Sequence, residues 1–317
     1  MSAQTQARAP LEAPRASRLA SWLELARPFS LTASVVPVLV GGALAWQDGS
    51  LTAWTWPLAL VLAVLVQVGT NIVNEVYDVA NGVDRPDSAR ASHVVVQGRI
   101  APASALRGAW VAFSLAAVGG LVLVWMRGLP MLVIGLVGLV TGYFYTAPPV
   151  HFKYRGLAVP GVFVLMGPLH VLGAYVATGG ALSWRAVLVG IPIGFLVAAI
   201  LHGNELRDLE DDSKGPFRTL TIIIGRVAGA WLYVAMMVGA YGGLALLVLA
   251  GQLPWPALVA LLTVPAAWRN ARRALDGARG RLESLTWLDI ASARVHLQFG
   301  LLMTAGIAVA ALGWVAR

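Results

Sequence analysis

Nine long apolar stretches constrain this chain more than any other feature. They cover residues 30–46, 54–77, 105–126, 129–146, 157–177, 185–203, 227–250, 254–269 and 296–315. Because about 20 apolar residues cross the ~30 Å hydrocarbon core of a bilayer as a helix, each stretch is long enough, or nearly so, to span a membrane. The weakest is 254–269, which is short and contains proline. The sequence predicts an all-α, polytopic membrane protein of about nine transmembrane helices.

The composition supports a membrane protein and argues against several other classes. Of the 317 residues only 12% are charged and 58% are hydrophobic, whereas an ordinary soluble domain carries roughly 25% charge. The net charge of +8 does not point to nucleic acid, because the basic residues lie in short segments between apolar stretches, where they set topology. The absence of cysteine excludes disulfides, thiolate metal sites and cysteine nucleophiles.

The charged residues predict an orientation in the membrane. With the N-terminus in the cytoplasm, all but three of the 23 Lys and Arg residues fall on the cytoplasmic side, the exceptions being Arg127, Arg185 and Arg317. This is the distribution that the positive-inside rule describes. Acidic residues have no general preference for a side, yet all 15 except Asp48 also lie there. Their clustering on one side therefore needs a cause of its own.

The segment before the first apolar stretch has no apolar core of a signal peptide and is rich in Ala, Arg, Pro and Ser. We expect residues 1–20 to form a disordered cytoplasmic tail. Residues 21–317 are then a single transmembrane domain.

An acid-rich segment emerges from the second apolar stretch without a turn signal. At 3.6 residues per turn, Asn74 and Asp78 lie on one face of the predicted helix, with Glu75 beside them. Gly82 lets the helix stop, so that Asp84 turns back toward the same face. The pattern predicts a cluster of oxygen ligands at the end of a membrane helix.

A second segment of the same kind follows the sixth apolar stretch. Asn204, Asp208 and Asp212 recur every fourth residue and form one stripe of a helix, while His202 lies off that stripe and is read as an interfacial polar residue. In both segments an Asn precedes an Asp by four residues and a further Asp follows. The repetition predicts two facing half-sites in two pseudo-equivalent halves of the domain.

Several carboxylates close together near a membrane require a compensating cation. Each costs about 2.5–3.5 kcal/mol on insertion scales, and the carboxylates repel one another. Hard oxygen ligands without a His/Cys set are those that Mg²⁺ prefers, typically together with substrate phosphate oxygens. A diphosphate bound in this way becomes a good leaving group, which favours allylic carbocation chemistry. The alternative is that the acids are solvated helix ends paired with Arg207, Arg85 and Lys214.

Basic residues near the acids are candidates for binding the diphosphate, although the positive-inside rule alone would also place them there. The four candidates next to the acidic segments are Arg85, Arg90, Lys214 and Arg218.

The loop after the fourth apolar stretch is a third candidate. It contains Tyr145, whose ring is suited to shield a cation, and the basic residues Lys153 and Arg155. An interfacial aromatic belt ended by prolines would look similar.

In these residues the chain resembles the UbiA-type superfamily of intramembrane aromatic prenyltransferases, which has nine helices and Asp-rich motifs after the second and sixth. Segments 74–87, 145–156 and 204–212 look most like the 1,4-dihydroxy-2-naphthoate polyprenyltransferase branch, which makes demethylmenaquinone. Two departures are Glu75, where Asp is commoner, and Glu205, where a second Asn is frequent. They leave other acceptors open, such as 4-hydroxybenzoate, homogentisate or another quinone or lipid precursor.

The resemblance implies a site and a reaction. Mg²⁺ and a polyprenyl diphosphate would be surrounded by Asn74, Asp78, Asp84, Asn204, Asp208 and Asp212. The four aspartates would be catalytic, the two asparagines would also contact substrate, and the helices would enclose a central chamber open sideways to lipid. Ionisation would give an allylic cation, which the naphthoate ring attacks with loss of its carboxyl group. The resemblance implies a bacterial inner membrane, an active site facing the cytoplasm and no protein or nucleic acid partner.

Two rival classes are less well supported. A CDP-alcohol phosphotransferase also places Asp residues and Mg²⁺ at the cytoplasmic membrane edge, but its Asp-Gly…Ala-Arg…Gly…Asp…Asp pattern is absent. A transporter would be expected to carry its acids near the midplane of broken helices rather than at two cytoplasmic helix ends.

Overall fold

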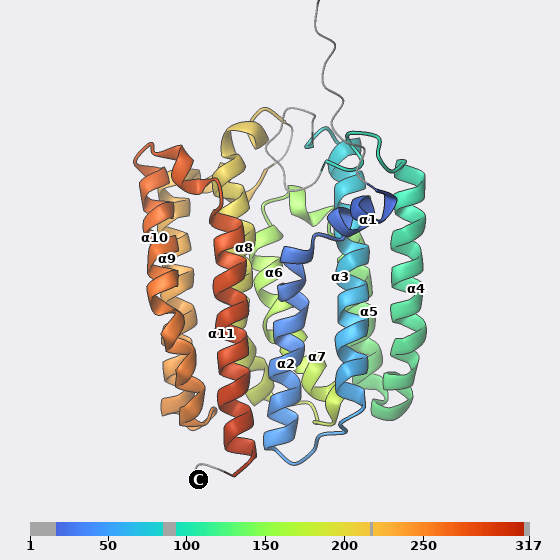
Figure 1. Ribbon diagram of the computed structural model, residues 1–317, viewed down its shortest axis with the longest axis vertical. Coiled ribbons are helices and arrows are strands. Elements are labelled where there is room, and N and C mark those ends of the chain that lie inside the picture. Colours follow the sequence, from blue (N-terminus) through green and yellow to red (C-terminus); the bar gives the residue numbers. More distant parts are fainter. Residues whose placement is uncertain (1–16, 85–92, 216–217, 314–317) are drawn as a thin grey trace, which may run out of the picture.

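The structure is a computed structural model that describes residues 17–84, 93–215 and 218–313. Within these ranges the chain is helical and contains no strand, apart from one isolated bridge between Arg155 and Arg218. Seven helical segments are long and apolar enough to cross a membrane, and Leu129–Phe144 is a shorter apolar helix. The predicted all-α, polytopic membrane fold is confirmed (Figure 1). The count of nine crossings and the cytoplasmic N-terminus stay predictions.

Every predicted apolar stretch coincides with helical backbone. The elements are α1 (Arg18–Ala26), η1 (Pro28–Leu31), α2 (Thr32–Gln47), α3 (Thr55–Ala80), α4 (Pro102–Arg127), α5 (Leu129–Phe144), η2 (Phe152–Tyr154), α6 (Ala158–Met166), α7 (Pro168–Thr178), α8 (Trp184–Asp212), α9 (Leu220–Leu249), η3 (Trp255–Thr263), α10 (Val264–Ala278), η4 (Leu282–Leu285) and α11 (Leu288–Ala311). Residues 1–16 of the expected tail lie outside the described residues, and the chain is already helical from Arg18.

The predicted span 157–177 is broken into α6 and α7 at Gly167. Pro168 begins α7, and a proline cannot continue the preceding helix because it lacks an N–H and its ring clashes with the turn before it. Gly167 is needed there, since a Cβ on it would lie 2.4 Å from the Cα of Gly194 in α8. The break therefore brings the α6–α7 backbone into close contact with α8.

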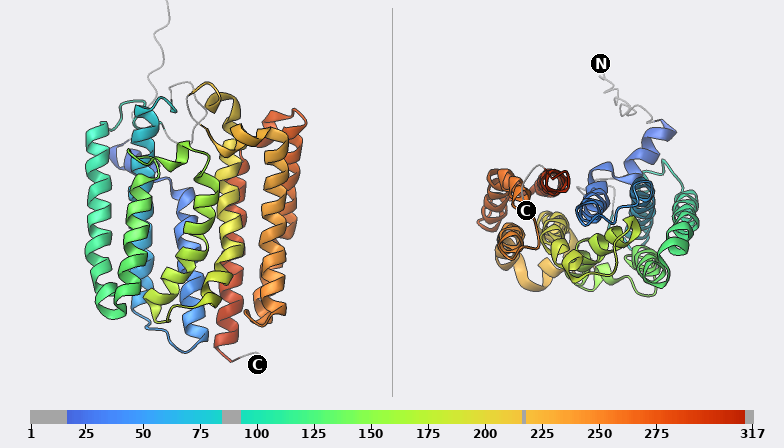
Figure 2. Two further views of the ribbon diagram at one scale, coloured as in Figure 1. Left: turned by 180° about the vertical axis from the view of Figure 1, so that it is seen from behind. Right: turned by 90° about the horizontal axis from the view of Figure 1, so that it is seen from below.

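The helices form a bundle with one end that carries most of the charge. Figure 2 shows α9, α10 and α11 grouped on one side and α3, α4 and α5 on the other, with α2, α6, α7 and α8 between them. The helices α3 and α8, which carry the two acidic motifs, terminate at the same end, where α1 also lies (Figure 1). We call this the polar end. At the opposite end Asp48, the exceptional acid, pairs with Arg185 at 2.5 Å.

The main core lies where α2, α8, α9 and α11 pack together. Its fully buried side chains include Leu44, Ile193, Tyr233, Leu244 and Phe299. On the outside, large apolar side chains such as those of Trp125 and Leu249 are more than four-fifths exposed, as expected for a surface that faces lipid.

Candidate active site

A single cavity of about 480 Å³ connects the polar end with the apolar interior of the bundle. Its wall at the polar end includes all six predicted ligand residues: Asn74, Asp78, Asp84, Asn204, Asp208 and Asp212. Deeper parts of its wall are apolar and include Leu62, Leu123, Met131, Leu165 and Leu169. Within the described residues, none of the lining residues comes from α9, α10 or α11. Two segments separated by about 130 residues of sequence thus share one cavity.

The first motif reaches the cavity because α3 ends in a tight turn. The helix stops at Ala80, and Gly82 adopts a φ of +73°, a region that residues with a side chain rarely enter. The backbone N–H groups of Val83 and Asp84 then both donate to the carbonyl oxygen of Asp78, at 2.8 and 3.1 Å. Asp84 is consequently held next to Asp78, as the position of Gly82 predicted.

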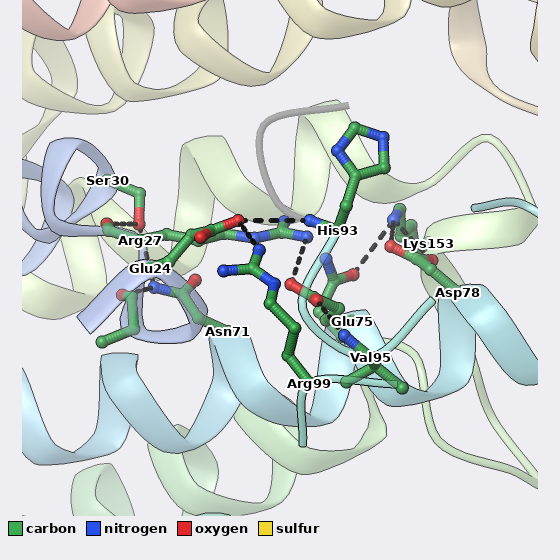
Figure 3. A network of polar contacts seen from close by, with 12 residues as sticks. Glu24, Arg27, Ser30, Asn71, Glu75, Asp78, His93, Val95, Arg99 and Lys153 are labelled. Atoms are coloured by element: carbon green, nitrogen blue, oxygen red, sulfur yellow. Dashed lines mark hydrogen bonds and ion pairs between the residues drawn. The ribbon is translucent and has the colours of Figure 1, made fainter. Parts of the chain in front are cut away.

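The carboxylate of Asp78 is held by two side chains from the loop around η2. The Lys153 ammonium donates to both carboxylate oxygens, at 2.8 and 2.7 Å, and to Oδ1 of Asn74 at 3.0 Å. The Tyr154 hydroxyl donates to Oδ1 of Asp78 at 2.6 Å. Burial and the neighbouring Asp78 carboxylate raise the pKa of Tyr154 far above its ordinary value, so this hydroxyl stays protonated. Figure 3 shows the ammonium of Lys153 directed at Asp78.

The second motif reaches the cavity without a turn, because α8 continues to Asp212 and keeps its stripe intact. Arg207, the residue before Asp208, binds both oxygens of that carboxylate, at 2.8 and 2.9 Å. The same guanidinium donates to Asp289 of α11 at 2.7 Å. Asp289 is 1% exposed, so Arg207 joins two buried carboxylates on different helices.

The four motif aspartates are buried rather than solvated. Their exposed fractions lie between 3% and 8%. The ion pairs to Arg207 and Lys214 that the alternative reading expected are both present, with Lys214 bound to Asp211 at 2.8 Å. The burial, however, argues against simple solvated helix ends, because buried carboxylates are costly unless they are paired or coordinate a cation.

The donor set fits a hard divalent cation by its chemistry. All six lining side chains offer carboxylate or amide oxygens, which suit Mg²⁺. In the part of the chain that the structure describes, no three Asp, Glu or His side chains are gathered closely enough to hold a metal ion as they stand. Lys153 and Arg207 instead bind the central carboxylates of the two motifs.

Comparison with known proteins identifies this architecture. Residues 34–293 match the model of the UbiA prenyltransferase family. The chain belongs to this family. It is therefore an integral membrane polyprenyltransferase, which excludes the phosphotransferase and transporter readings.

Two relatives named 1,4-dihydroxy-2-naphthoate octaprenyltransferase are similar over most of the chain. The protein from Bacillus subtilis is 29% identical over 90% of this chain and 91% of its own length. The protein from Mycobacterium tuberculosis is 31% identical over 83% of this chain and 88% of its own length. The resemblance to the 1,4-dihydroxy-2-naphthoate polyprenyltransferase branch is therefore confirmed, at 29% and 31% identity.

Solved structures of UbiA homologues share the fold. The apo structure of a homologue from Aeropyrum pernix K1 superimposes with a TM-score of 0.65, at 19% identity, over 88% of this chain and 97% of that one. A homologue from Archaeoglobus fulgidus bound to GPP and Mg²⁺ gives a TM-score of 0.58, at 17% identity, over 89% of this chain and 99% of that one.

The other predicted residues of this UbiA-family chain occupy different places. Tyr145 lines the cavity, with its ring centroid 5.1 Å from that of Phe152 in an edge-on contact. Arg155, Lys214 and Arg218 are not among the residues that line the cavity. Lys214 is 64% exposed where it pairs with Asp211. Arg85 and Arg90 lie outside the described residues.

His202 is fully buried and does not line the cavity. Its Nε2 lies 2.7 Å from the carbonyl oxygen of Gly229, and its Nδ1 lies 3.4 Å from Oγ1 of Thr221. It therefore connects α8 to α9, which agrees with a structural role, and its interfacial position in the membrane stays a prediction.

The structure adds cavity residues that the sequence analysis did not propose as part of the binding site. Arg27 and Gln67 line the cavity near the first motif, and Arg207 lines it near the second. Gln67 carried a signal, since a polar side chain inside an apolar stretch is costly to expose to lipid and is expected to face the interior of the bundle. Arg27 carried none, because a single sequence does not separate it from arginines that set topology.

Proposed function

We propose that this prenyltransferase moves a polyprenyl group from an allylic diphosphate to 1,4-dihydroxy-2-naphthoate in a Mg²⁺-dependent reaction. The observation that carries the proposal is the joint cavity, with two Asn/Asp stripes at its polar end and an apolar wall beyond them. The polar end suits a diphosphate with its cations, and the apolar part suits an isoprenoid chain. The acceptor is supported by the names of the Bacillus and Mycobacterium relatives, and the cation by the Archaeoglobus homologue solved with GPP and Mg²⁺.

The residues that would hold Mg²⁺ are the six Asn and Asp side chains at the polar end. When bound there, Mg²⁺ supplies positive charge to the diphosphate and stabilises the charge that develops on its departing oxygens. The Lys153 ammonium and the Arg27 guanidinium add N–H donors at the same end of the cavity. Together they favour the diphosphate as a leaving group.

The chain's own residues also explain how an allylic cation survives. The apolar wall excludes water from the prenyl chain, and the ring of Tyr145 offers a π-face toward the cation. The bond between C1 of the prenyl chain and the diphosphate oxygen breaks, a bond from C1 to the naphthoate ring forms, and the ring's carboxyl group leaves as CO₂. No covalent enzyme intermediate is needed.

The direct test is an assay with purified protein, Mg²⁺, a polyprenyl diphosphate and a panel of acceptors, with products identified by mass spectrometry. We expect demethylmenaquinol from 1,4-dihydroxy-2-naphthoate, which oxygen in the air then oxidises to demethylmenaquinone before detection. A product from 4-hydroxybenzoate or homogentisate instead would overturn the acceptor, and no product from any aromatic acceptor would overturn the proposed transfer.

We further propose that the polar end faces the cytoplasm of a bacterial inner membrane, on the strength of the basic residues gathered there. Because the chain has no cysteine, single cysteines report topology cleanly. In intact cells, a membrane-impermeant thiol reagent should label Ala53→Cys at the opposite end and leave Glu283→Cys at the polar end unlabelled. The reverse pattern would invert the orientation.

A further inference from the structure

Two buried glutamates take no part in the chemistry described above. Glu75 directly follows Asn74, and Glu205 directly follows Asn204. Their exposed fractions are 0% and 4%. Since neighbours on a helix point about 100° apart, Glu75 lies off the cavity wall that Asn74 lines, whereas Glu205 borders that wall beside Asn204 and directs its carboxylate to the start of α9. Burying a carboxylate is costly without partners, so the contacts of these two side chains indicate what they do.

Glu75 joins α3 to two other segments (Figure 3). Its Oε1 accepts the backbone N–H of Val95 at 3.1 Å, in the segment that leads into α4. Its Oε2 lies 3.5 Å from Nη2 of Arg27, the cavity-lining arginine between α1 and η1. The same two segments are also joined by Glu24 of α1, which accepts from Arg99 at 2.6 Å. Glu75 and Glu24 together therefore join α1, α3 and the segment that leads into α4.

Arg27 combines an unusual backbone conformation with an ion pair to Glu75. Its backbone has a φ of +53°, which few residues other than glycine adopt. Its side chain is 17% exposed, and its only ion pair among the described residues is the one to Glu75. A cationic side chain at the cavity wall is therefore held by a carboxylate that does not itself line the cavity.

Glu205 makes the corresponding contact in the second half. Its Oε2 accepts the backbone N–H of Thr221 at 3.0 Å and the Thr221 hydroxyl at 3.1 Å. Thr221 lies in the first turn of α9, where free N–H groups attract a negative charge. Like the N–H of Val95, the N–H of Thr221 belongs to the segment that follows the acidic motif and leads into the next long helix. We call this the returning segment.

We propose that Glu75 and Glu205 are paired positioning residues for the diphosphate site. Each binds the backbone N–H of the returning segment and thereby fixes the rotation of the helix end that presents the motif's Asn and Asp to the cavity. Glu75 additionally holds Arg27 in place to bind the diphosphate. This inference rests on the proposed function, because the site it concerns is the diphosphate site.

The two positions differ in one testable respect. The hydrogen bonds to Glu205 come from a neutral N–H and a neutral O–H, which the amide oxygen of a glutamine also accepts, and Nδ1 of His202 lies 3.8 Å from Oε2 of Glu205. Glu75 has a neutral partner and a cationic one, and a glutamine loses the charge. Glu75→Gln should therefore raise the KM for the polyprenyl diphosphate about tenfold with a smaller change in kcat. Glu205→Gln should stay within about threefold of wild type.

Matched variants test whether the rise in KM comes from losing the contact between Glu75 and Arg27. Arg27→Gln should reproduce the KM effect of Glu75→Gln, and the double variant should be no worse than either, because both changes remove the same interaction. Glu210→Gln is the control, since Glu210 lies on the same helix end as Glu205 but is 56% exposed and pairs with Arg226. It should behave as wild type. A wild-type KM in Glu75→Gln, or fully additive effects, would overturn the role assigned to Glu75.

Hydrogen–deuterium exchange tests the positioning role without turnover. In substrate-free protein, Glu75→Ala should speed exchange in the peptide containing Val95 but not in that containing Thr221, and Glu205→Ala should do the opposite. If either alanine variant does not fold, the corresponding methionine variant is measured, which keeps the length of the side chain but offers no oxygen acceptor to the N–H. Unchanged exchange overturns the proposal even in an active enzyme, whereas an inactive wild-type protein with the expected exchange pattern overturns only the proposed function.

Discussion

The two acidic motifs share a residue pattern and a cavity, yet their central aspartates are held in different ways. Asp78 of the first motif is bound by Lys153 and Tyr154, which belong to a separate loop. Asp208 of the second is bound by Arg207, its neighbour on the same helix, which also binds the buried Asp289 of α11. A partner on a loop can exchange a carboxylate for a phosphate without disturbing the bundle. We infer that the partners of Asp78 can rearrange when a diphosphate binds, whereas those of Asp208 stay in place. We call the first motif with its partners the adaptable half and the second motif with its partners the fixed half.

The largest expected effect falls equally on both halves. Asp78→Ala and Asp208→Ala should each lower turnover by at least about 10²–10³-fold, because each removes a charged group on which diphosphate activation depends. Expression and membrane insertion should be retained. The control is Asp211→Asn, since Asp211 lies on the same helix end but pairs with Lys214 away from the cavity. Activity retained in either alanine variant would mean that the motif in question is only a structural helix end.

Replacing the basic partner of each central aspartate should affect the two halves differently. Lys153→Met should raise the KM for the polyprenyl diphosphate about 10-fold and lower thermal stability only in part, because Tyr154 still donates to the single carboxylate that loses its cation. Arg207→Met leaves Asp208 and Asp289 buried without that cation, and removing one partner of a buried pair costs about 3–5 kcal/mol. The melting temperature in detergent should therefore fall much further in Arg207→Met. Equal stability losses would erase the distinction between an adaptable and a fixed half.

Titration with Mg²⁺ asks whether the halves bind cations alike. Asp84→Asn and Asp212→Asn each remove one anionic oxygen ligand, so each should raise the Mg²⁺ concentration for half-maximal activity, by about tenfold. A chelator should abolish wild-type activity, and added Mg²⁺ should restore it. If only one variant changes its Mg²⁺ requirement, the cation belongs to that half alone, and activity that survives the chelator would contradict metal dependence altogether.

The parts of this molecule that sequence predicted well are those governed by short-range periodicity. The apolar stretches matched helices because a bilayer requires a minimum helix length, and the stripe from Asn204 to Asp212 kept its spacing because α8 is continuous. The turn at Gly82 was predictable for the same reason, since its positive φ is a local property of the chain.

The parts that sequence did not predict depend on contacts between distant segments. Nothing near Arg27 reveals that its guanidinium meets Glu75, and nothing near Arg207 reveals the buried Asp289. The two departures from the family pattern, Glu75 and Glu205, were visible in the sequence. Their meaning depends on Val95 and Thr221, which lie 20 and 16 residues further along the chain and approach only when the next segment folds back.

The smallest expected effect concerns Lys214, the only lysine of the chain besides Lys153. It is 64% exposed and pairs with Asp211, and such surface pairs contribute only about 0–1 kcal/mol. Lys214→Gln should therefore change kcat and the KM for the polyprenyl diphosphate by less than about twofold, whereas Lys153→Gln should raise that KM clearly. A loss in Lys214→Gln as large as in Lys153→Gln would show that Lys214 reaches the diphosphate when substrate is bound. The second half would then also possess a movable cation, and the fixed character inferred from Arg207 would no longer distinguish the two motifs.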